Sequence, residues 1–271
     1  MKENNEWAHK VAVVIPVYKA APNANEQQAL HQCLNILGKH PIVLVCPQSL
    51  DVGFYQSIAK RHQASLNVQR LSDQYFKGIS GYNHMLMSTT FYRAFKTYRY
   101  ILVYQLDAWV FRDELDYWCG LGYDYIGAPW FENYGTYEDG NKLWSVGNGG
   151  FSLRRIQYFI GLLEHNGPIK DANTLGLTSS LKNRIYKFLY AKGYQNRVSY
   201  FRKDPTLFED VFYTVYLKGT RFKANVPSAE EAALFAFEKS PSYLYSITGK
   251  LPFGCHAWEK NEYESFWKSR M

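Results

Sequence analysis

The stretch VAVVIP at residues 11–16 decides the fold, because it is an unbroken run of mostly β-branched apolar residues that ends at a proline. Such a run is typical of a strand that is buried on both faces of a parallel sheet. Apolar residues then recur at helical spacing over residues 25–37, and Gly38 follows as a stop signal. A second short apolar run at residues 41–47 is bracketed by prolines. Strand, helix and strand in this order predict a right-handed crossover and a parallel sheet.

The same alternation continues along the first half of the chain. We expect a helix at residues 54–62, a strand at 65–71, a long helix at 80–96 and a buried strand at 100–106. After about residue 120 the elements become shorter, without a repeat or a clear linker. We therefore predict one α/β domain over residues 1–271, with a mixed, mainly parallel sheet flanked by helices. Ligands of such sheets bind beyond the carboxyl ends of the strands.

The net charge of +7 is concentrated in one segment. Residues 172–203 contain no Asp or Glu, and their seven cations are Lys182, Arg184, Lys187, Lys192, Arg197, Arg202 and Lys203. The aromatic residues interleaved with these charges include Tyr186, Phe188, Tyr190, Tyr194 and Tyr200. Such a segment is either a solvated helix face or a surface that attracts a phosphate-rich partner. We expect it to contact the acceptor or an anionic membrane surface.

The start of the chain is polar, and no apolar run approaches the ~20 residues that span a bilayer. Four cysteines are far apart and form no Cys-x-x-Cys pair, which argues against a zinc ribbon or a disulfide framework. We therefore expect a cytoplasmic protein, peripheral at most at the inner face of a membrane.

Five motifs carry a resemblance to a known superfamily. They are YQLDAWVF at residues 104–111, GAPW at 127–130, GNGGFSLR at 147–154, EDVF at 209–212 and PFGCHAW at 252–258. In this order they resemble the GT-A glycosyltransferases, and most closely a bacterial family assigned to them. The resemblance implies a single Rossmann-like GT-A domain in which residues 1–120 bind a nucleotide sugar and residues 121–271 bind the acceptor and hold the catalytic residues.

The implied reaction moves a sugar from a nucleotide-diphosphate donor, a UDP-sugar, to a hydroxyl of a glycan or lipid-linked acceptor in bacterial cell-surface polysaccharide or lipopolysaccharide synthesis. The enzyme must then neutralise charge on the departing diphosphate. The resemblance implies that Asp107 and His256 hold Mn²⁺ or Mg²⁺, as carboxylates of an Asp-x-Asp motif do in the superfamily. Trp109 replaces the second Asp, which puts the metal in question, and a cationic His256 is an alternative diphosphate ligand. The residues expected to bind the nucleotide sugar are Pro16, Val17, Tyr18, Lys77, Asn83, Gln105, Asp107, Trp109, Asn148, Gly149 and Gly150.

The resemblance also implies the catalytic pair. Glu209 and Asp210 open an apolar helix, where the helix dipole favours negative charge. We predict that Asp210 is the general base of an inverting transfer, and that Glu209 orients the acceptor or caps the helix. A glycine-rich run at residues 147–150 is expected to lie close to the donor sugar. Arg154 and Arg155 are expected to reach a phosphate or to sit in solvent.

Two other functions compete with this one. A nucleotidyltransferase shares the nucleotide-binding half of the architecture, but such enzymes carry a glycine-rich loop after the first strand, and residues 16–20 contain no glycine. A non-catalytic basic module that binds membrane or nucleic acid explains residues 172–203 but not the acids at Asp107 and Asp210. We expect no nucleic-acid partner.

Overall fold

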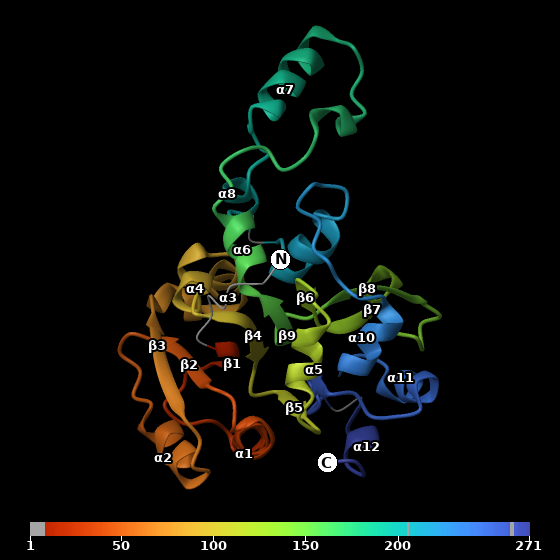
Figure 1. Ribbon diagram of the computed structural model, residues 1–271. Helices are drawn as coiled ribbons and strands as arrows, with labels where there is room; N and C mark the ends of the chain where they lie inside the picture. Colours follow the sequence, from red (N-terminus) through yellow and green to blue (C-terminus); the bar gives the residue numbers. More distant parts are fainter. Residues whose placement is uncertain (1–8, 205, 261–262) are drawn as a thin grey trace.

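The computed structural model describes residues 9–204, 206–260 and 263–271, and within these ranges its central sheet has six strands (Figure 1). They lie in the order β3-β2-β1-β4-β9-β6. Their bounds are His9–Pro16 for β1, Ile42–Pro47 for β2, Leu66–Leu71 for β3, Tyr98–Tyr104 for β4, Tyr125–Ile126 for β6 and Phe151–Arg155 for β9. Strands β1 to β4 are mutually parallel, and β9 is antiparallel to both β4 and β6. The predicted mixed, mainly parallel sheet is confirmed.

Both faces of this sheet are covered, which explains the unbroken apolar sequence of its strands. Val11, Val13 and Ile15 of β1 join one hydrophobic cluster, whereas Ala12 and Val14 join a second cluster on the opposite face. The first cluster is closed by α1 Ala24–Leu37, α2 Gly53–Arg61 and α5 Leu115–Gly120, and the second by α3 Gly78–Leu86, α4 Thr89–Ala94 and α6 Ile156–Leu163. Successive side chains of a strand point to opposite faces of the sheet, so alternate residues of β1 pack into two separate hydrophobic clusters.

One predicted helix is in fact two. The helix expected over residues 80–96 is interrupted between α3 and α4. Ser88 adopts an extended backbone conformation there, and its side chain accepts a hydrogen bond from the backbone N–H of Phe91. This N-cap starts α4 as a separate helix, a tendency of serine that the helical spacing of apolar residues does not reveal.

The remaining elements are short and build a third hydrophobic cluster. Strands β5 Ala108–Val110, β10 Ala236–Phe237 and β11 Gly254–His256 form a small sheet in the order β10-β11-β5. Strands β7 Ala128–Phe131 and β8 Leu143–Gly147 form an antiparallel pair around the 3-10 turn η2 Glu132–Tyr134. Helices α10 Ala229–Phe235, α11 Pro241–Thr248 and α12 Glu264–Trp267 cover these strands. Because β6 and β9 complete the sheet begun by β1 to β4, segments on both sides of residue 120 share one sheet.

A helical protrusion stands away from this body (Figure 1). It contains η3 Ala172–Leu175, α7 Leu181–Ala191 and α8 Val198–Phe201. The chain then returns to the body through α9 Glu209–Val211, which runs directly into the π-helical turn η4 Phe212–Tyr216. A short 3-10 helix, η1 Asp73–Phe76, precedes α3. Across the described ranges, none of the helices combines the length and the apolar character needed to cross a bilayer.

Candidate active site

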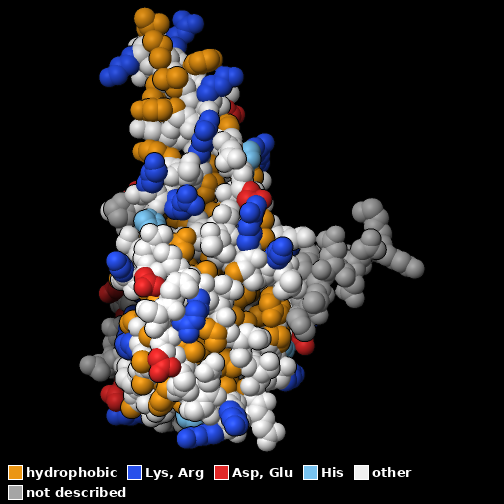
Figure 2. Space-filling view, turned by 90° about the vertical axis from the view of Figure 1, so that its left-hand side faces the viewer, with side chains coloured by type: hydrophobic (Ala, Val, Ile, Leu, Met, Phe, Trp, Pro, Cys, Tyr) orange, Lys and Arg blue, Asp and Glu red, His pale blue; other side chains and the backbone are white. Residues whose placement is uncertain are grey.

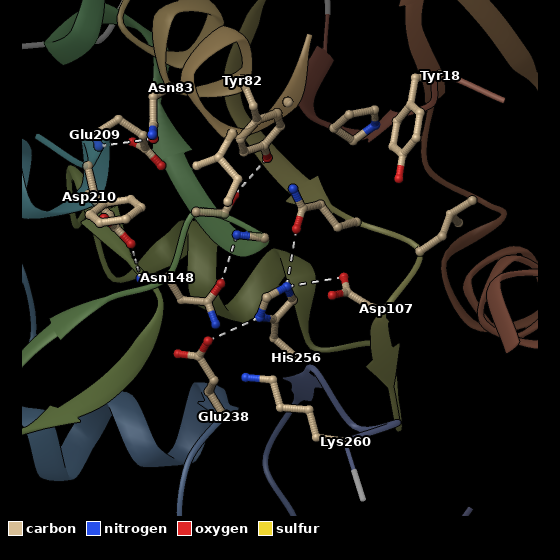
Figure 3. Close-up of a pocket in the computed structure, with 18 of the residues that line it drawn as sticks. Tyr18, Tyr82, Asn83, Asp107, Asn148, Glu209, Asp210, Glu238, His256 and Lys260 are labelled. Carbon is tan, nitrogen blue, oxygen red and sulfur yellow. Dashed lines mark hydrogen bonds and ion pairs between the residues drawn. The ribbon is translucent and has the colours of Figure 1, made fainter. Parts of the chain in front are cut away.

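A cavity of about 1330 Å³ opens beyond the carboxyl ends of β1 and β4, where a ligand of an open α/β sheet is expected. Twelve of the fourteen residues assigned to the site from the sequence line it (Figure 3). They are Pro16, Val17, Tyr18, Asn83, Gln105, Asp107, Asn148, Gly149, Gly150, Glu209, Asp210 and His256. These residues come from distant parts of the chain, so the fold assembles the motifs into one place.

Two of the assigned residues lie outside the lining of this cavity. Lys77 is an exposed residue that precedes α3. Trp109 lies in the middle of β5, opposite Cys255 of β11, and its ring packs against Trp258 at a centroid distance of 5.5 Å. The position of the missing second carboxylate is therefore occupied by a side chain of the third hydrophobic cluster.

Asp210 is the acid whose environment favours proton transfer near neutral pH. Its Oδ2 accepts a hydrogen bond of 3.0 Å from the backbone N–H of Asn148, and its Oδ1 accepts one of 2.8 Å from the N–H of Val211. Burial, followed by the neighbouring charge of Glu209, raises the pKa of Asp210 to about 7. A carboxyl group with that pKa is matched to general base catalysis at neutral pH.

Glu209 has a different environment, although it is adjacent in sequence. Its two carboxylate oxygens accept hydrogen bonds of 2.9 and 2.8 Å from the two terminal nitrogens of Arg154. Arg154 is fully buried and also donates to the hydroxyl groups of Tyr92 and Ser152. The bidentate pair neutralises both charges inside the protein and fixes the start of α9.

The expectation for Arg154 is therefore wrong. The guanidinium of Arg154 is buried in the core and pairs with Glu209, so Arg154 neither reaches a phosphate nor lies in solvent. Sequence spacing could not show this, since the two residues are 55 positions apart. Glu209 lines the cavity, and both of its carboxylate oxygens accept hydrogen bonds from Arg154.

The glycine-rich turn before β9 allows side chains to approach the backbone closely. A Cβ on Gly149 would lie 2.6 Å from Oε1 of Glu209, and one on Gly150 would lie 2.1 Å from Nε2 of His256. Gly147 makes room for the ring of Trp130 in the same way, at 1.8 Å. The turn is glycine-rich because a side chain at any of these three positions would collide with Glu209, His256 or Trp130.

Asn148 shapes this turn and offers one free donor. Its backbone has a φ of 96°, and its Oδ1 accepts hydrogen bonds from the N–H groups of Gly150 and Phe151 at 2.8 and 3.0 Å. Asparagine tolerates this left-handed conformation better than most residues. The side-chain Nδ2 is buried and has no hydrogen-bond partner among the described residues. It is therefore available to a ligand in the cavity.

His256 lies between two carboxylates (Figure 3). Its Nε2 is 3.1 Å from Oδ1 of Asp107, an ion-pair contact without hydrogen-bond geometry, and 3.2 Å from Oε1 of Gln105. Its Nδ1 is 3.3 Å from Oε1 of Glu238. Although burial alone would lower the pKa of His256, the charges of Asp107 and Glu238 raise it to about 10. The side chain is thus an imidazolium cation. Burial would raise the pKa of Asp107 and of Glu238, but the contacts with His256 and, more weakly, the charge of Lys260 lower the pKa of both.

The predicted metal site consists of two side chains, those of Asp107 and His256. Within the described ranges, no group of three or more His, Cys, Asp or Glu side chains is arranged to hold a metal ion. Asp107 and His256 are brought together as expected, with Nε2 of His256 3.1 Å from Oδ1 of Asp107. In this arrangement the two predicted ligands contact each other, so a divalent cation between them would have to displace the proton of His256 and take its remaining ligands from the donor phosphates. The cation that Asp107 contacts is the side chain of His256 itself.

Comparison with known proteins places the chain in a family. A family model described as "Protein of unknown function (DUF5672)" matches residues 65–256. The chain belongs to the DUF5672 family. The matched range includes four of the five motifs in full and the fifth as far as His256. Among curated proteins, none matches this DUF5672 chain.

Two solved structures are similar to the DUF5672 chain at low identity. One is core-mannan synthase A from Aspergillus fumigatus in its Mn/GDP form, with 9% identity, 74% of this chain and 71% of that chain covered, and a TM-score of 0.41. The other is TarS 1–349 from S. aureus, with 13% identity, 68% and 55% of the respective chains covered, and a TM-score of 0.35.

Several cavity residues of the DUF5672 chain were not identified from the sequence. Glu238 follows β10, a strand of two residues that gives no recognisable pattern. Lys239 and Lys260 also line the cavity, the latter shortly after the PFGCHAW motif. Trp130 belongs to the GAPW motif, to which the sequence assigns no role, and Tyr134 lies beside it with a ring-centroid distance of 5.3 Å. The GAPW motif was the one available signal for this aromatic wall.

Proposed function

We propose that the protein is an inverting glycosyltransferase that moves a sugar from a UDP-sugar to a hydroxyl group of a glycan or lipid-linked acceptor. One observation carries the proposal. Asp210, an acid with a pKa of about 7, and the imidazolium of His256 face the same cavity on opposite sides of Asn148 (Figure 3). A base for the acceptor and a cation for the leaving diphosphate are what a sugar transfer needs. The resemblance of the five motifs to GT-A enzymes points to the same chemistry.

The donor is proposed to bind at the end of the cavity formed by the first half of the chain, residues 1–120. Pro16, Val17 and the exposed Tyr18 offer an apolar and aromatic surface for the uracil base. The diphosphate is then within the field of His256 and Lys260, and the unpaired Nδ2 of Asn148 supplies a hydrogen bond to the donor. His256 belongs to the second half of the chain, so the donor site draws on both halves.

The charge of the leaving diphosphate is proposed to be balanced by side chains of this chain. The imidazolium of His256 and the ammonium groups of Lys260 and Lys239 line the cavity. In a site that excludes water, fixed cations stabilise a developing charge more strongly than they do in bulk water. The proposal therefore includes no step that depends on a metal.

The acceptor is proposed to enter along the aromatic wall of Trp130 and Tyr134, from the second half of the chain. Sugar rings present apolar C–H faces that stack on such side chains. In the reaction, the acceptor oxygen forms a bond to the anomeric carbon, and its proton passes to the carboxylate of Asp210. The bond from that carbon to the diphosphate oxygen breaks, and UDP leaves with the electron pair. Attack from the face opposite the diphosphate inverts the configuration.

Glu209 is proposed to be a positioning residue rather than the base. Its carboxylate is held in a bidentate pair by Arg154, and taking up the acceptor proton would remove the negative charge on which that pair depends. Through the rigid start of α9 it fixes the backbone that carries Asp210. Its negative charge also helps to raise the pKa of Asp210.

A thermal-shift panel tests the donor assignment. UDP-, GDP-, CMP- and dTDP-sugars are added with Mn²⁺, with Mg²⁺ and with EDTA, because a ligand that binds the native state raises its melting temperature. We expect UDP-sugars to stabilise the protein most and EDTA to leave the shift in place. Stabilisation by GDP- or CMP-sugars alone would contradict the choice of donor. A shift that requires Mn²⁺ would contradict the metal-independent site.

A further inference from the structure

We infer that the basic protrusion, residues 172–203, docks the protein onto an anionic lipid surface through the apolar face of α7. This inference does not depend on the proposed glycosyl transfer, since it concerns a surface outside the cavity. The protrusion stands clear of the sheet and its flanking helices (Figure 1). Its length in sequence is far greater than a connection between α6 and α9 requires.

The first observation is that α7 turns its apolar side toward solvent. Leu181, Ile185, Phe188 and Leu189 recur at the spacing of one helix face, and they are 73%, 53%, 63% and 41% exposed. An ordinary surface helix of a globular protein buries such a stripe against the core. Figure 2 shows hydrophobic side chains running up the protrusion with Lys and Arg side chains at their edges.

The opposite side of α7 shows that this orientation is held in place. Tyr190 is buried, and the hydroxyl group of Tyr186 donates to Oε1 of Gln195 at 3.1 Å. The side chain of Asn183 donates to Oγ1 of Thr178 at 2.7 Å. The helix therefore uses the face of Tyr186 and Tyr190 for internal packing and leaves the side chains of its apolar face exposed to solvent. A turn of the helix about its axis would break these contacts. Nζ of Lys192 lies 5.8 Å from the ring centroid of Phe188 at the edge of the apolar face.

The root of the protrusion is attached to the body by specific packing. Phe201 of α8 packs against Phe212 and Tyr216 at centroid distances of 5.7 and 4.5 Å. Buried Asn196 accepts a hydrogen bond from the N–H of Lys170 and donates to its carbonyl oxygen, at 2.9 and 2.8 Å. The apolar face is thus presented at a fixed place relative to η4, the segment that follows Asp210.

The second observation is the charge around that face. The 31 Lys and Arg residues of the chain exceed its 24 Asp and Glu residues by seven, which equals the number of cations in the protrusion. Of these, Lys182 and Arg184 lie on α7 at the borders of the apolar stripe. None of the seven forms an ion pair with a carboxylate in the part of the chain that the structure describes. An anionic membrane surface offers negatively charged headgroups to these unpaired cations and an apolar acyl-chain boundary to the exposed apolar side chains.

Two other occupants fit this surface less well. A second copy of the chain would bring two protrusions of the same charge together, which costs energy through repulsion. A nucleic acid would satisfy the cations, but its phosphate backbone would leave Leu181 and Ile185 without an apolar partner. A lipid headgroup layer accommodates both the charges and the aliphatic groups, because the latter enter the boundary of the acyl chains.

Vesicle co-sedimentation of the full chain tests this inference. Vesicles of phosphatidylcholine alone are compared with vesicles that contain roughly one third phosphatidylglycerol. We expect binding to the anionic vesicles and little binding to the neutral ones. Each Lys or Arg near an anionic surface contributes about fivefold in partitioning, so the triple variant Lys182→Gln/Arg184→Gln/Lys187→Gln is expected to bind about 100-fold less strongly. Raising the salt concentration weakens the wild type in the same direction.

A second variant separates the apolar contribution from the charge. Ile185→Ser/Phe188→Ser keeps all cations and is expected to lower partitioning at least roughly tenfold, including at high salt, where screening removes most of the electrostatic part. The matched controls are Ile247→Ser on α11, an exposed isoleucine of the body, and Lys60→Gln/Arg61→Gln/Lys250→Gln. Both controls are expected to bind as the wild type does. All substituted side chains are at least partly exposed, so unchanged circular dichroism is expected for each variant.

Several results would overturn the inference. One is a wild type that binds neither kind of vesicle, and another is binding that both α7 variants leave unchanged. A wild-type dimer that the serine variant dissociates, without vesicle binding, would assign the face to a second copy. Retention of RNA without vesicle binding would assign it to nucleic acid. None of these results bears on donor binding, which is measured without lipid.

Discussion

The backbone N–H of Asn148 lies 3.0 Å from Oδ2 of Asp210, to which it donates a hydrogen bond. The side chain of the same residue accepts a hydrogen bond from the N–H of Gly150, whose Cα lies against the imidazole of His256. One residue with a left-handed backbone therefore connects the proposed base with the proposed binding site for the diphosphate. The separation of the two groups is set by a single tight turn, and this rigidity is what a transfer between two bound substrates requires.

The transfer rate is expected to rise with pH through a midpoint near 7. Asp210 accepts a proton only when it is ionised, and its pKa is raised to about 7 by burial and by the charges of Glu209 and, more weakly, Glu238. Below the midpoint the carboxyl group is protonated and the rate falls about tenfold for each pH unit. Initial rates at saturating substrates, measured between about pH 5.5 and 8.5, check this limb. A flat profile would show that Asp210 does not control the rate.

Glu209→Gln is expected to destabilise the protein strongly. The substitution leaves the buried charge of Arg154 without its partner, and breaking such a pair typically costs 3–5 kcal/mol, so we expect a loss of about that size in the free energy of unfolding. Urea denaturation followed by circular dichroism measures it. The double variant Glu209→Gln/Arg154→Met removes both charges and is expected to recover part of the loss. A single variant within about 1 kcal/mol of the wild type would contradict the assigned role.

The sequence predicts an element of this fold well where the element's own residues specify it. The strand at residues 11–16 and the helix after it are confirmed, because each is specified by its own run of apolar residues. The break between α3 and α4 depends on one hydroxyl group, that of Ser88, and was not predicted. The helix expected after Asp210 turns out to be one short α-helical turn followed by the π-helical turn η4. Packing of Phe212 and Tyr213 in the core accompanies that change of geometry.

In the candidate site, too, the sequence predicts which residues take part better than it predicts their contacts. Most of the residues that the motifs identify line one cavity. The reason is that a parallel sheet brings the carboxyl ends of its strands to one edge, where ligands bind. The motifs did not reveal what each side chain contacts. Arg154 binds Glu209 from 55 positions away, and Glu238 binds His256 from 18 positions away. Such pairs depend on tertiary packing, which no local spacing encodes.

Gly150→Ala is expected to weaken donor binding. Its Cβ would lie 2.1 Å from Nε2 of His256 and 2.5 Å from Oε1 of Gln105, so both side chains must move. We expect the dissociation constant for UDP to rise roughly tenfold, measured by calorimetry. Gly161→Ala on α6 is the control, since its Cβ would meet no atom within 4 Å and alanine favours a helix. Equal affinities of the two variants for UDP would contradict the prediction that donor binding depends on the close packing of Gly150 against His256.

Lys260→Gln is expected to reduce the preference for the diphosphate over the nucleoside. Lys260 lines the cavity and is exposed, so its loss should not affect folding. Binding of UDP should weaken by about 1 kcal/mol or more, whereas binding of uridine should remain unchanged. Lys250→Gln, at an exposed position outside the cavity, serves as the control. A parallel loss for UDP and uridine would place Lys260 at the base rather than at the diphosphate.

The measurement that tests the account most directly compares transfer with donor binding in Asp210→Asn. A general base contributes to the transition state and not to donor affinity, so turnover is expected to fall about 10²–10⁴-fold while the dissociation constant for the UDP-sugar stays within about twofold of the wild type. Circular dichroism confirms folding, and Asp204→Asn, an exposed acid outside the cavity, is the matched control. Near-native transfer by Asp210→Asn would contradict the central claim and would place the base elsewhere.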